Sequence, residues 1–168
     1  STYISIDGGD GADTFQVGQV FRSPREVNAN VAPGDEIITV ETTRGFLSNG
    51  VSYCMDIYGG EGNDTFQVYH NKAVLGLYGE NGDDKFVVRA FVILDDSALQ
   101  AMTNLNGGGG ADHISYVINA PVNIEGGDGT DTLTVLGTEF PDNFVVTEDG
   151  IYGAGLNISY DTIEIVEV

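Results

Sequence analysis

Five aspartates occupy the same place in a nine-residue phrase that occurs five times along this chain. The phrase reads Gly-Gly-x-Gly-x-Asp-x-U-x, where U is apolar, and two clear copies are GGDGADTFQ and GGEGNDTFQ. The sixth-position residues of the five copies are Asp13, Asp64, Asp84, Asp112 and Asp131. Glycine permits positive φ angles, so a loop of this kind can turn several carbonyl oxygens toward one point. A carboxylate added to such carbonyls gives the oxygen ligands that Ca²⁺ prefers.

Other oxygen donors lie in the same phrases. The third position supplies Asp10, Glu61, Asn81 and Asp128, the fifth supplies Asn63 and Asp83, and the opening glycines of four copies are Gly59, Gly79, Gly107 and Gly126. Calcium takes six to eight oxygens, which one loop cannot provide, so we expect two loops to share an ion. The spacings of 20 from Asp64 to Asp84 and 19 from Asp112 to Asp131 predict the best-formed ions between these pairs.

The elements that must position these loops are strands. Apolar residues alternate on both sides of each phrase, as in Ile4 and Ile6 before the first copy and Phe15 and Val17 after it. A period of two is typical of a strand. A single strand-loop-strand unit cannot bury its apolar face, so we expect the units to stack with loops about 4.8 Å apart. Aspartates from adjacent loops would then repel one another unless a cation lay between them.

These phrases and their flanking strands resemble the hemolysin-type, or repeat-in-toxin, calcium-binding β-roll and β-helix proteins of bacteria. The resemblance implies an all-β chain, a right-handed parallel β-helix over residues 1–168, with Ca²⁺ as its cofactor. The family's usual β-roll repeats the phrase every nine residues and binds calcium on both edges. Here the sixth-position aspartates are separated by 51, 20, 28 and 19 residues, which predicts one phrase per coil and calcium along one edge only.

We predict about seven coils. The gap of 51 is interpreted as two coils, because GDEIITV from Gly34 aligns with GADTFQV from Gly11 and puts Glu36 in the place of Asp13. Near the end, DTIEI from Asp161 resembles DTLTV from Asp131 without the glycines. We expect both weak copies to have kept the strand and lost the metal.

Three inserts interrupt the repeats. Residues 18–33 contain two prolines and two arginines and are predicted to form an external loop. Residues 90–104 place Asp95, Asp96 and Ser97 before an apolar run, which predicts a short capped helix. Residues 137–158 include PDNFVV, which is similar to DDKFVV from Asp83, and the stretch resembles a linker unit of long bacterial surface repeat proteins.

The composition favours an extracellular calcium protein. Six Lys and Arg against 26 Asp and Glu give a formal net charge of −20, which repels nucleic acid and anionic membranes. These residues show no signal-peptide pattern and no apolar run long enough to span a membrane, so we expect the secretion signal to lie elsewhere in a longer protein. Because the chain begins and ends within the strand pattern, we expect a segment of a longer secreted or cell-surface protein. Its expected partners are calcium ions and neighbouring coils of that parent protein.

Catalysis is not expected. Cys54 is the single cysteine, and His70 and His113 have no metal-ligand spacing. Two alternatives stay open: a carbohydrate-active β-helix, such as a lyase, hydrolase or epimerase of uronic-acid polysaccharides, would need cations such as Arg22 and Arg25, and ice binding would need an unbroken ladder of Thr or Asn. The fifth and seventh loop positions form no such ladder. The favoured function is a rigid spacer or scaffold, adhesin-like or toxin-like, that folds with Ca²⁺.

Overall fold

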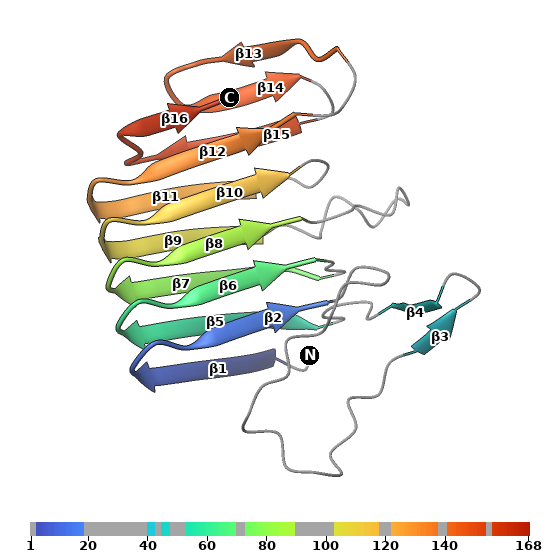
Figure 1. Cartoon of the computed structure of the whole chain (residues 1–168), viewed down its shortest axis with the longest axis vertical. Coiled ribbons are helices and arrows are strands. Elements are labelled where there is room, and N and C mark those ends of the chain that lie inside the picture. The colour runs from blue at the N-terminus through green and yellow to red at the C-terminus, as the bar shows by residue number, and fades with distance from the viewer. Residues whose placement is uncertain are drawn as a thin grey trace.

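The computed structural model describes residues 3–18, 40–42, 45–47, 53–69, 73–89, 103–117, 122–137, 141–153 and 156–168. Strands make up all the regular structure in these ranges, which confirms the all-β class. No helix in the described ranges is long and apolar enough to cross a membrane. The strands form one sheet of eight, one sheet of six and a two-stranded hairpin (Figure 1).

The two large sheets are built from a unit that recurs along the chain: a strand of the eight-stranded sheet, a glycine loop and a strand of the six-stranded sheet. The strands before the loops are β1 (Tyr3–Asp10), β5 (Cys54–Glu61), β7 (Leu75–Asn81), β9 (Thr103–Gly110), β11 (Val122–Gly129) and β15 (Leu156–Asp161). The strands after them are β2 (Thr14–Val17), β6 (Thr65–Val68), β8 (Lys85–Val88), β10 (His113–Val117), β12 (Thr132–Leu136) and β16 (Ile165–Glu167). Within each of these two sets, neighbouring strands pair in parallel.

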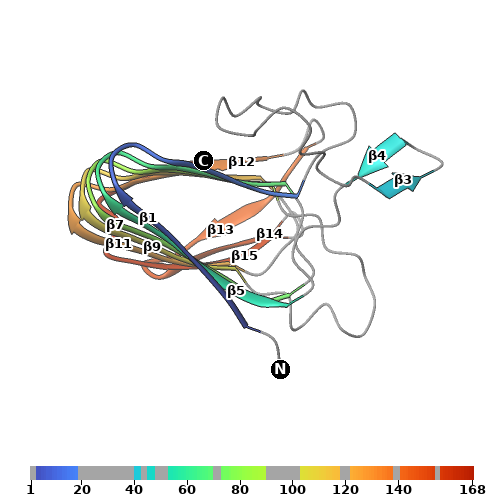
Figure 2. The same cartoon turned by 90° about the horizontal axis from the view of Figure 1, so that it is seen from below.

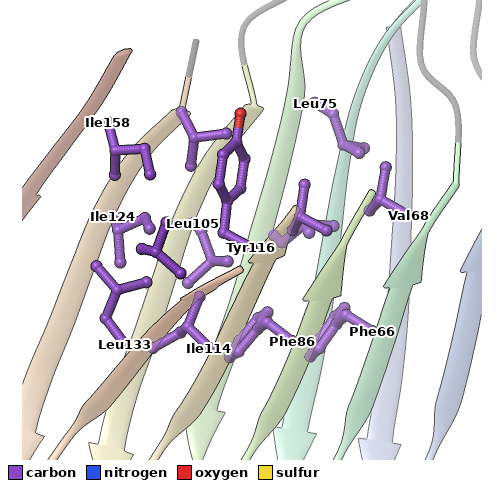
Figure 3. Packing of buried hydrophobic residues seen from close by; sticks show 14 of the residues in the cluster. Phe66, Val68, Leu75, Phe86, Leu105, Ile114, Tyr116, Ile124, Leu133 and Ile158 are labelled. Carbon is purple, nitrogen blue, oxygen red and sulfur yellow. The ribbon is translucent and has the colours of Figure 1, made fainter. Parts of the chain in front are cut away.

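The core fills the space between the two sheets, because equivalent apolar residues of successive units lie in register. One row of the six-stranded sheet runs through Phe15, Phe66, Phe86, Ile114, Leu133 and Val166. The Phe66 and Phe86 rings stack with centroids 4.7 Å apart and an interplanar angle of 5°. Figure 3 shows Ile114 and Leu133 of this row near Leu105 and Ile124, which come from the facing sheet. The predicted alternation of buried and outward residues is therefore confirmed in these strands.

The C-terminal end has a different arrangement. After β12 the chain forms β13 (Phe144–Val146) and β14 (Gly150–Gly153), which pair antiparallel, and β14 pairs antiparallel with β15. Ile151 is fully buried and Phe144 packs against the core. The two cartoon views place β13 across this end, between the planes of the two sheets (Figures 1 and 2). The β13–β14 hairpin thus covers apolar surface at this end of the core that a further parallel unit would otherwise cover.

The prediction of about seven coils is wrong for the described residues, which form six units. The strands β1 and β5 are direct neighbours in one sheet, and β2 and β6 are direct neighbours in the other, so no unit lies between them. Instead, part of the intervening segment forms a separate sheet from β3 (Val40–Thr42) and β4 (Gly45–Leu47). Of GDEIITV only Val40 is described, and it begins β3, which lies outside both large sheets. Glu36 lies outside the described residues.

The three predicted inserts have different outcomes. Of 18–33, only Gly18 is described, and the predicted helix within 90–104 lies outside the described residues except for Thr103 and Asn104, which begin β9. The stretch 137–158 contributes β13, β14 and the start of β15. Within PDNFVV, Phe144–Val146 forms β13, but unlike the strand of DDKFVV it pairs antiparallel and belongs to the other sheet.

Candidate functional site

The five sixth-position aspartates form one continuous row at the loop edge. In the first four loops the backbone N–H of the aspartate donates to Oδ1 of the aspartate in the next unit, from Asp13 to Asp64 at 2.6 Å, Asp64 to Asp84 at 2.7 Å, Asp84 to Asp112 at 2.8 Å and Asp112 to Asp131 at 2.9 Å. The row includes the Asp84–Asp112 contact across the spacing of 28, so all successive phrases are neighbours. The predicted pairing of Asp64 with Asp84 and of Asp112 with Asp131 is a part of this row.

The second carboxylate oxygen of every aspartate in the row is buried and has no hydrogen-bond partner in the described part of the chain. These atoms are Oδ2 of Asp13, Asp64, Asp84, Asp112 and Asp131. Asp64, Asp84, Asp112 and Asp131 are each at most 2% exposed. A buried carboxylate oxygen without a donor is costly, because burial removes the water that would solvate its charge. Five such atoms in equivalent positions require a common explanation.

Burial changes the acidity of the central aspartates. It is the main reason that the pKa of Asp84 rises to about 7 and that of Asp112 to about 6, from an ordinary value of 3.8. Hydrogen bonds from the backbone amides of Asp64 and Asp84 act in the lowering direction, and neighbouring carboxylates raise the pKa further. The pKa of Asp64 is also raised, again chiefly by burial. Without a compensating positive charge, these carboxyls hold protons more tightly than free aspartate does.

The opening glycine of each phrase leaves room for two oxygens. A Cβ atom built on Gly79 would lie 2.0 Å from Asp84 Oδ2 and 2.3 Å from the carbonyl oxygen of Gly107 in the next unit. The same pair of oxygens surrounds Gly59 and Gly107, at 2.1 to 2.7 Å from the equivalent point. Because glycine has no side chain, the carboxylate oxygen and the carbonyl oxygen of the next unit approach the same position.

The second glycine of the phrase allows neighbouring loops to stack closely. Gly60 has a φ of 105°, and a Cβ there would lie 2.1 Å from the carbonyl oxygen of Gly9. In the third copy of the phrase this position is Glu80, which keeps a positive φ of 76°. A non-glycine residue held in this region indicates that the register of neighbouring loops imposes the backbone conformation.

The third-position residues form a separate, exposed row. Asp10, Glu61, Asn81 and Asp128 lie in register on the outside of the loops, with Gly109 between the last two. The Asn81 amide donates to Glu61 at 2.8 Å. At the fifth position, Asn63 Oδ1 accepts from the Asp83 backbone at 3.0 Å, and Asp83 Oδ1 accepts from Ala111 at 2.9 Å. These side chains therefore form hydrogen bonds between neighbouring loops on their exposed side, and they do not belong to the buried row of Oδ2 atoms.

The described residues contain no group of three or more His, Cys, Asp or Glu side chains placed to share a metal ion. Each candidate position instead combines one carboxylate oxygen with a backbone carbonyl oxygen of the next unit. This all-oxygen set suits a hard cation such as Ca²⁺ and lacks the nitrogen or sulfur ligands typical of zinc. The oxygens are therefore of the kind that Ca²⁺ prefers, and the two at each position are a part of the six to eight that the ion takes.

The sixth unit was aligned wrongly from the sequence. Asp161 pairs with Glu125, and the backbone N–H of Asp131 donates to Glu164 at 2.8 Å, so Glu164 stands where Asp161 was predicted. The N–H of Ile165 donates to the Asp131 carbonyl, as that of Thr132 donates to Asp112. The loop is shorter than the others and has no glycine phrase. The apolar alternation of Ile163 and Ile165 concealed this change of register.

Other polar residues singled out from the sequence do not gather at one place. Cys54 is exposed at the start of β5, and His113 is exposed on the outer face of β10. His70, Arg22 and Arg25 lie outside the described residues. Searches of protein-family models, curated proteins and solved structures found no match to this chain.

Proposed function

We propose that this chain is a calcium-binding right-handed parallel β-helix that acts as a rigid spacer or scaffold in a secreted or cell-surface bacterial protein. The observation that supports it most is the row of five buried Oδ2 atoms that have no hydrogen-bond partner among the described residues, each beside a carbonyl oxygen of the next unit. A bound calcium ion would supply positive charge between oxygens of successive loops. The aspartates, the glycine carbonyls and the stacked backbone would hold it.

Repulsion between neighbouring carboxylates favours a bound cation in the aspartate row. Charged carboxylates about 4.8 Å apart repel each other by roughly 3 kcal/mol at an effective dielectric constant near 20. The formal net charge of −20 adds to this cost over the whole chain. A divalent cation at each loop pair reverses the sign of the interaction, which makes the loop edge a source of stability.

Protonation is the competing explanation of the row. A protonated aspartic acid could donate from Oδ2 to the adjacent carbonyl oxygen, and the raised pKa values of Asp84 and Asp112 favour this in the absence of metal. The two explanations differ in pH dependence, because a proton satisfies these oxygens in acid and calcium satisfies them near neutrality. They also differ in their response to a chelator.

A scaffold role follows from how the units bury their apolar surface. Each unit contacts its neighbours through parallel strands in register, so the core is continuous and no unit is stable alone. Extracellular calcium modules bind with a Kd of about 10⁻⁴ to 10⁻³ M, so at about 2 mM calcium each independent site contributes about 0.6 to 2 kcal/mol. Several sites together equal a sizeable part of the stability of a small domain. At cytosolic calcium levels this contribution disappears, which supports an extracellular role.

Thermal unfolding with and without calcium tests the proposal. We expect the β-sheet circular dichroism signal of the chain to melt at a clearly higher temperature in 5 mM calcium than in chelator, with magnesium giving little of this shift. Bound metal in dialysed protein would be counted by mass spectrometry. If chelator leaves the melting temperature at pH 7.5 unchanged and no calcium is bound, protonation or bare packing explains the row and the proposal is wrong.

A further inference from the structure

The sixth unit meets the fifth through parallel strand pairs and through hydrogen bonds to the Asp131 backbone that resemble those between the other neighbours, although it lacks the glycine phrase. We infer that Thr162 and Glu164 complete one more cation site with Gly126 and Asp131. This inference rests on the calcium binding proposed above. It differs from the sequence-based expectation that the last weak copy has lost its metal.

The oxygen arrangement at Gly126 is the first support. A Cβ built on Gly126 would lie 2.5 Å from Asp131 Oδ2 and 2.1 Å from the carbonyl oxygen of Thr162. At Gly107 the corresponding distances are 2.1 Å to Asp112 Oδ2 and 2.4 Å to the carbonyl oxygen of Gly126. Thr162 therefore presents its carbonyl oxygen where the other units present that of a glycine.

Asp131 supplies independent evidence for a ligand at this position. Its side chain is 0% exposed, and its Oδ2 atom has no hydrogen-bond partner in the described part of the chain. If the sixth unit merely ended the row, this oxygen would be expected to face water or a donor. It is instead as enclosed as the equivalent oxygens of Asp84 and Asp112, which lie between two glycine phrases.

Glu164 replaces the next aspartate of the row. Its Oε2 accepts from the Asp131 backbone N–H at 2.8 Å, as Asp131 Oδ1 accepts from Asp112 at 2.9 Å. The shortened loop reaches this position three residues after Asp161, whereas the fifth unit takes six residues from the paired Glu125. The extra methylene of glutamate allows the carboxylate to reach across the shorter loop. Glu164 thus brings a negative charge and accepts the Asp131 backbone N–H as an aspartate does in the other units.

The backbone of Thr162 is held in an unusual conformation that serves this contact. Thr162 has a φ of 51°, which is rare for a β-branched residue, and its Oγ1 accepts from the Gly127 backbone N–H at 2.8 Å. Such a conformation is unfavourable for a residue with a side chain and persists only where the surrounding structure imposes it. Here the hydroxyl contact holds the loop so that the Thr162 carbonyl oxygen lies beside Asp131 Oδ2.

Diffraction from crystals of the whole chain grown in millimolar calcium tests this site directly. At a wavelength where calcium scatters anomalously, we expect a peak beside Gly126, Asp131 and the Thr162 carbonyl oxygen, in addition to peaks between successive glycine phrases. Peaks between glycine phrases with none at Gly126 would overturn this inference and leave the proposed function intact. The absence of every peak would overturn both.

Two matched substitutions extend the test to solution. Glu164→Gln keeps the size and an acceptor oxygen but removes the charge, whereas Glu167→Gln removes the same charge from the exposed end of β16. By titration calorimetry, we expect Glu164→Gln to weaken one calcium site by about 10- to 100-fold, as loss of an outer partner of a metal ligand does. Glu167→Gln should leave all sites unchanged. Equal binding by the two variants would contradict the role given to Glu164.

Discussion

The apolar rows of the interior and the aspartate row of the loop edge are produced by the same register, yet they have opposite energetics. Phe66 above Phe86 buries two rings against each other, and each such side chain contributes about 1.5 to 3 kcal/mol by leaving water. Asp84 beside Asp112 buries two carboxylates whose Oδ2 atoms have no donor in the described ranges. Stacking equivalent residues therefore stabilises the fold in the apolar rows with or without calcium. In the aspartate row it stabilises the fold only when a cation or a proton is bound.

The largest expected effect belongs to the apolar rows. Phe86→Ala removes a fully buried ring that stacks on Phe66, so we expect a loss of about 3 to 5 kcal/mol in the free energy of unfolding. The loss should be the same in calcium and in chelator, as measured by urea denaturation. Val87→Ala, on the half-buried outer face of the same strand, serves as the control and should cost much less. A calcium-dependent loss for Phe86→Ala would show that the two rows are not independent.

The second-largest effect is expected in the pH dependence of stability of the metal-free protein, because several carboxyls of the aspartate row contribute to it together. Asp84 and Asp112 have folded-state pKa values of about 7 and about 6, above their ordinary value of 3.8. Between about pH 4 and pH 7 the folded chain thus binds more protons than the unfolded chain, so its stability falls as the pH rises. Melting temperatures in chelator should decrease across this window. In calcium the decrease should vanish or reverse, and a flat profile in chelator would count against charged burial.

Gly79→Ala tests whether the space beside the aspartates is required. The new Cβ would lie 2.0 Å from Asp84 Oδ2 and 2.3 Å from the Gly107 carbonyl oxygen, so these oxygens must move apart. We expect a loss of about 1 to 3 kcal/mol in calcium, typical of overpacking. Gly109→Ala is the matched control, because its nearest neighbour would be 3.5 Å away. Similar melting temperatures for the two variants would mean that no specific oxygen geometry exists at Gly79.

The effect of Asp84→Asn on stability should have opposite signs in calcium and in chelator. Asparagine keeps an oxygen that can accept from the Asp64 backbone N–H, and its amide can donate at the position of Oδ2, which has no partner in the part of the chain that the structure describes. We expect about 1 to 2 kcal/mol of destabilisation in calcium, the value of one lost site, and a gain of similar size in chelator. The exposed Asp83→Asn should have little effect in either buffer. Stabilisation in both buffers would indicate that no ion binds at this position.

The smallest effect is expected inside the core. Thr103 lies in register between Leu75 and Val122, fully buried, and its Oγ1 has no hydrogen-bond partner among the described residues. Thr103→Val should therefore raise the free energy of unfolding by about 1 kcal/mol. The gain should be independent of calcium, which distinguishes it from substitutions in the aspartate row. Calorimetric melting in both buffers would measure it.

The sequence predicted those parts of the fold that depend on local pattern. The alternation of apolar residues around the phrases predicted the strands of five units. The aspartate repeated at the sixth position predicted the row of aspartates at the loop edge. The pairing of distant segments was not readable, because GDEIITV has a good strand pattern and yet β1 and β5 pair without it. The place of Glu164 was missed, because it follows from a hydrogen bond to Asp131 and not from a repeated residue. The Asp149–Gly150 pair is a turn signal between β13 and β14 that could have indicated the hairpin.

The separation of β3 and β4 from the two large sheets has a consequence for how such a chain can vary. At one edge the glycine loops have constant length and fix the rise from unit to unit. At the other edge the chain leaves after Val17 and returns at Cys54 without changing the register of β1 on β5 or of β2 on β6. New sequence can therefore be added at that edge without altering the pitch of the stack. An evolving or engineered protein could diversify its surface there, one connection at a time, while the aspartate row stays the same.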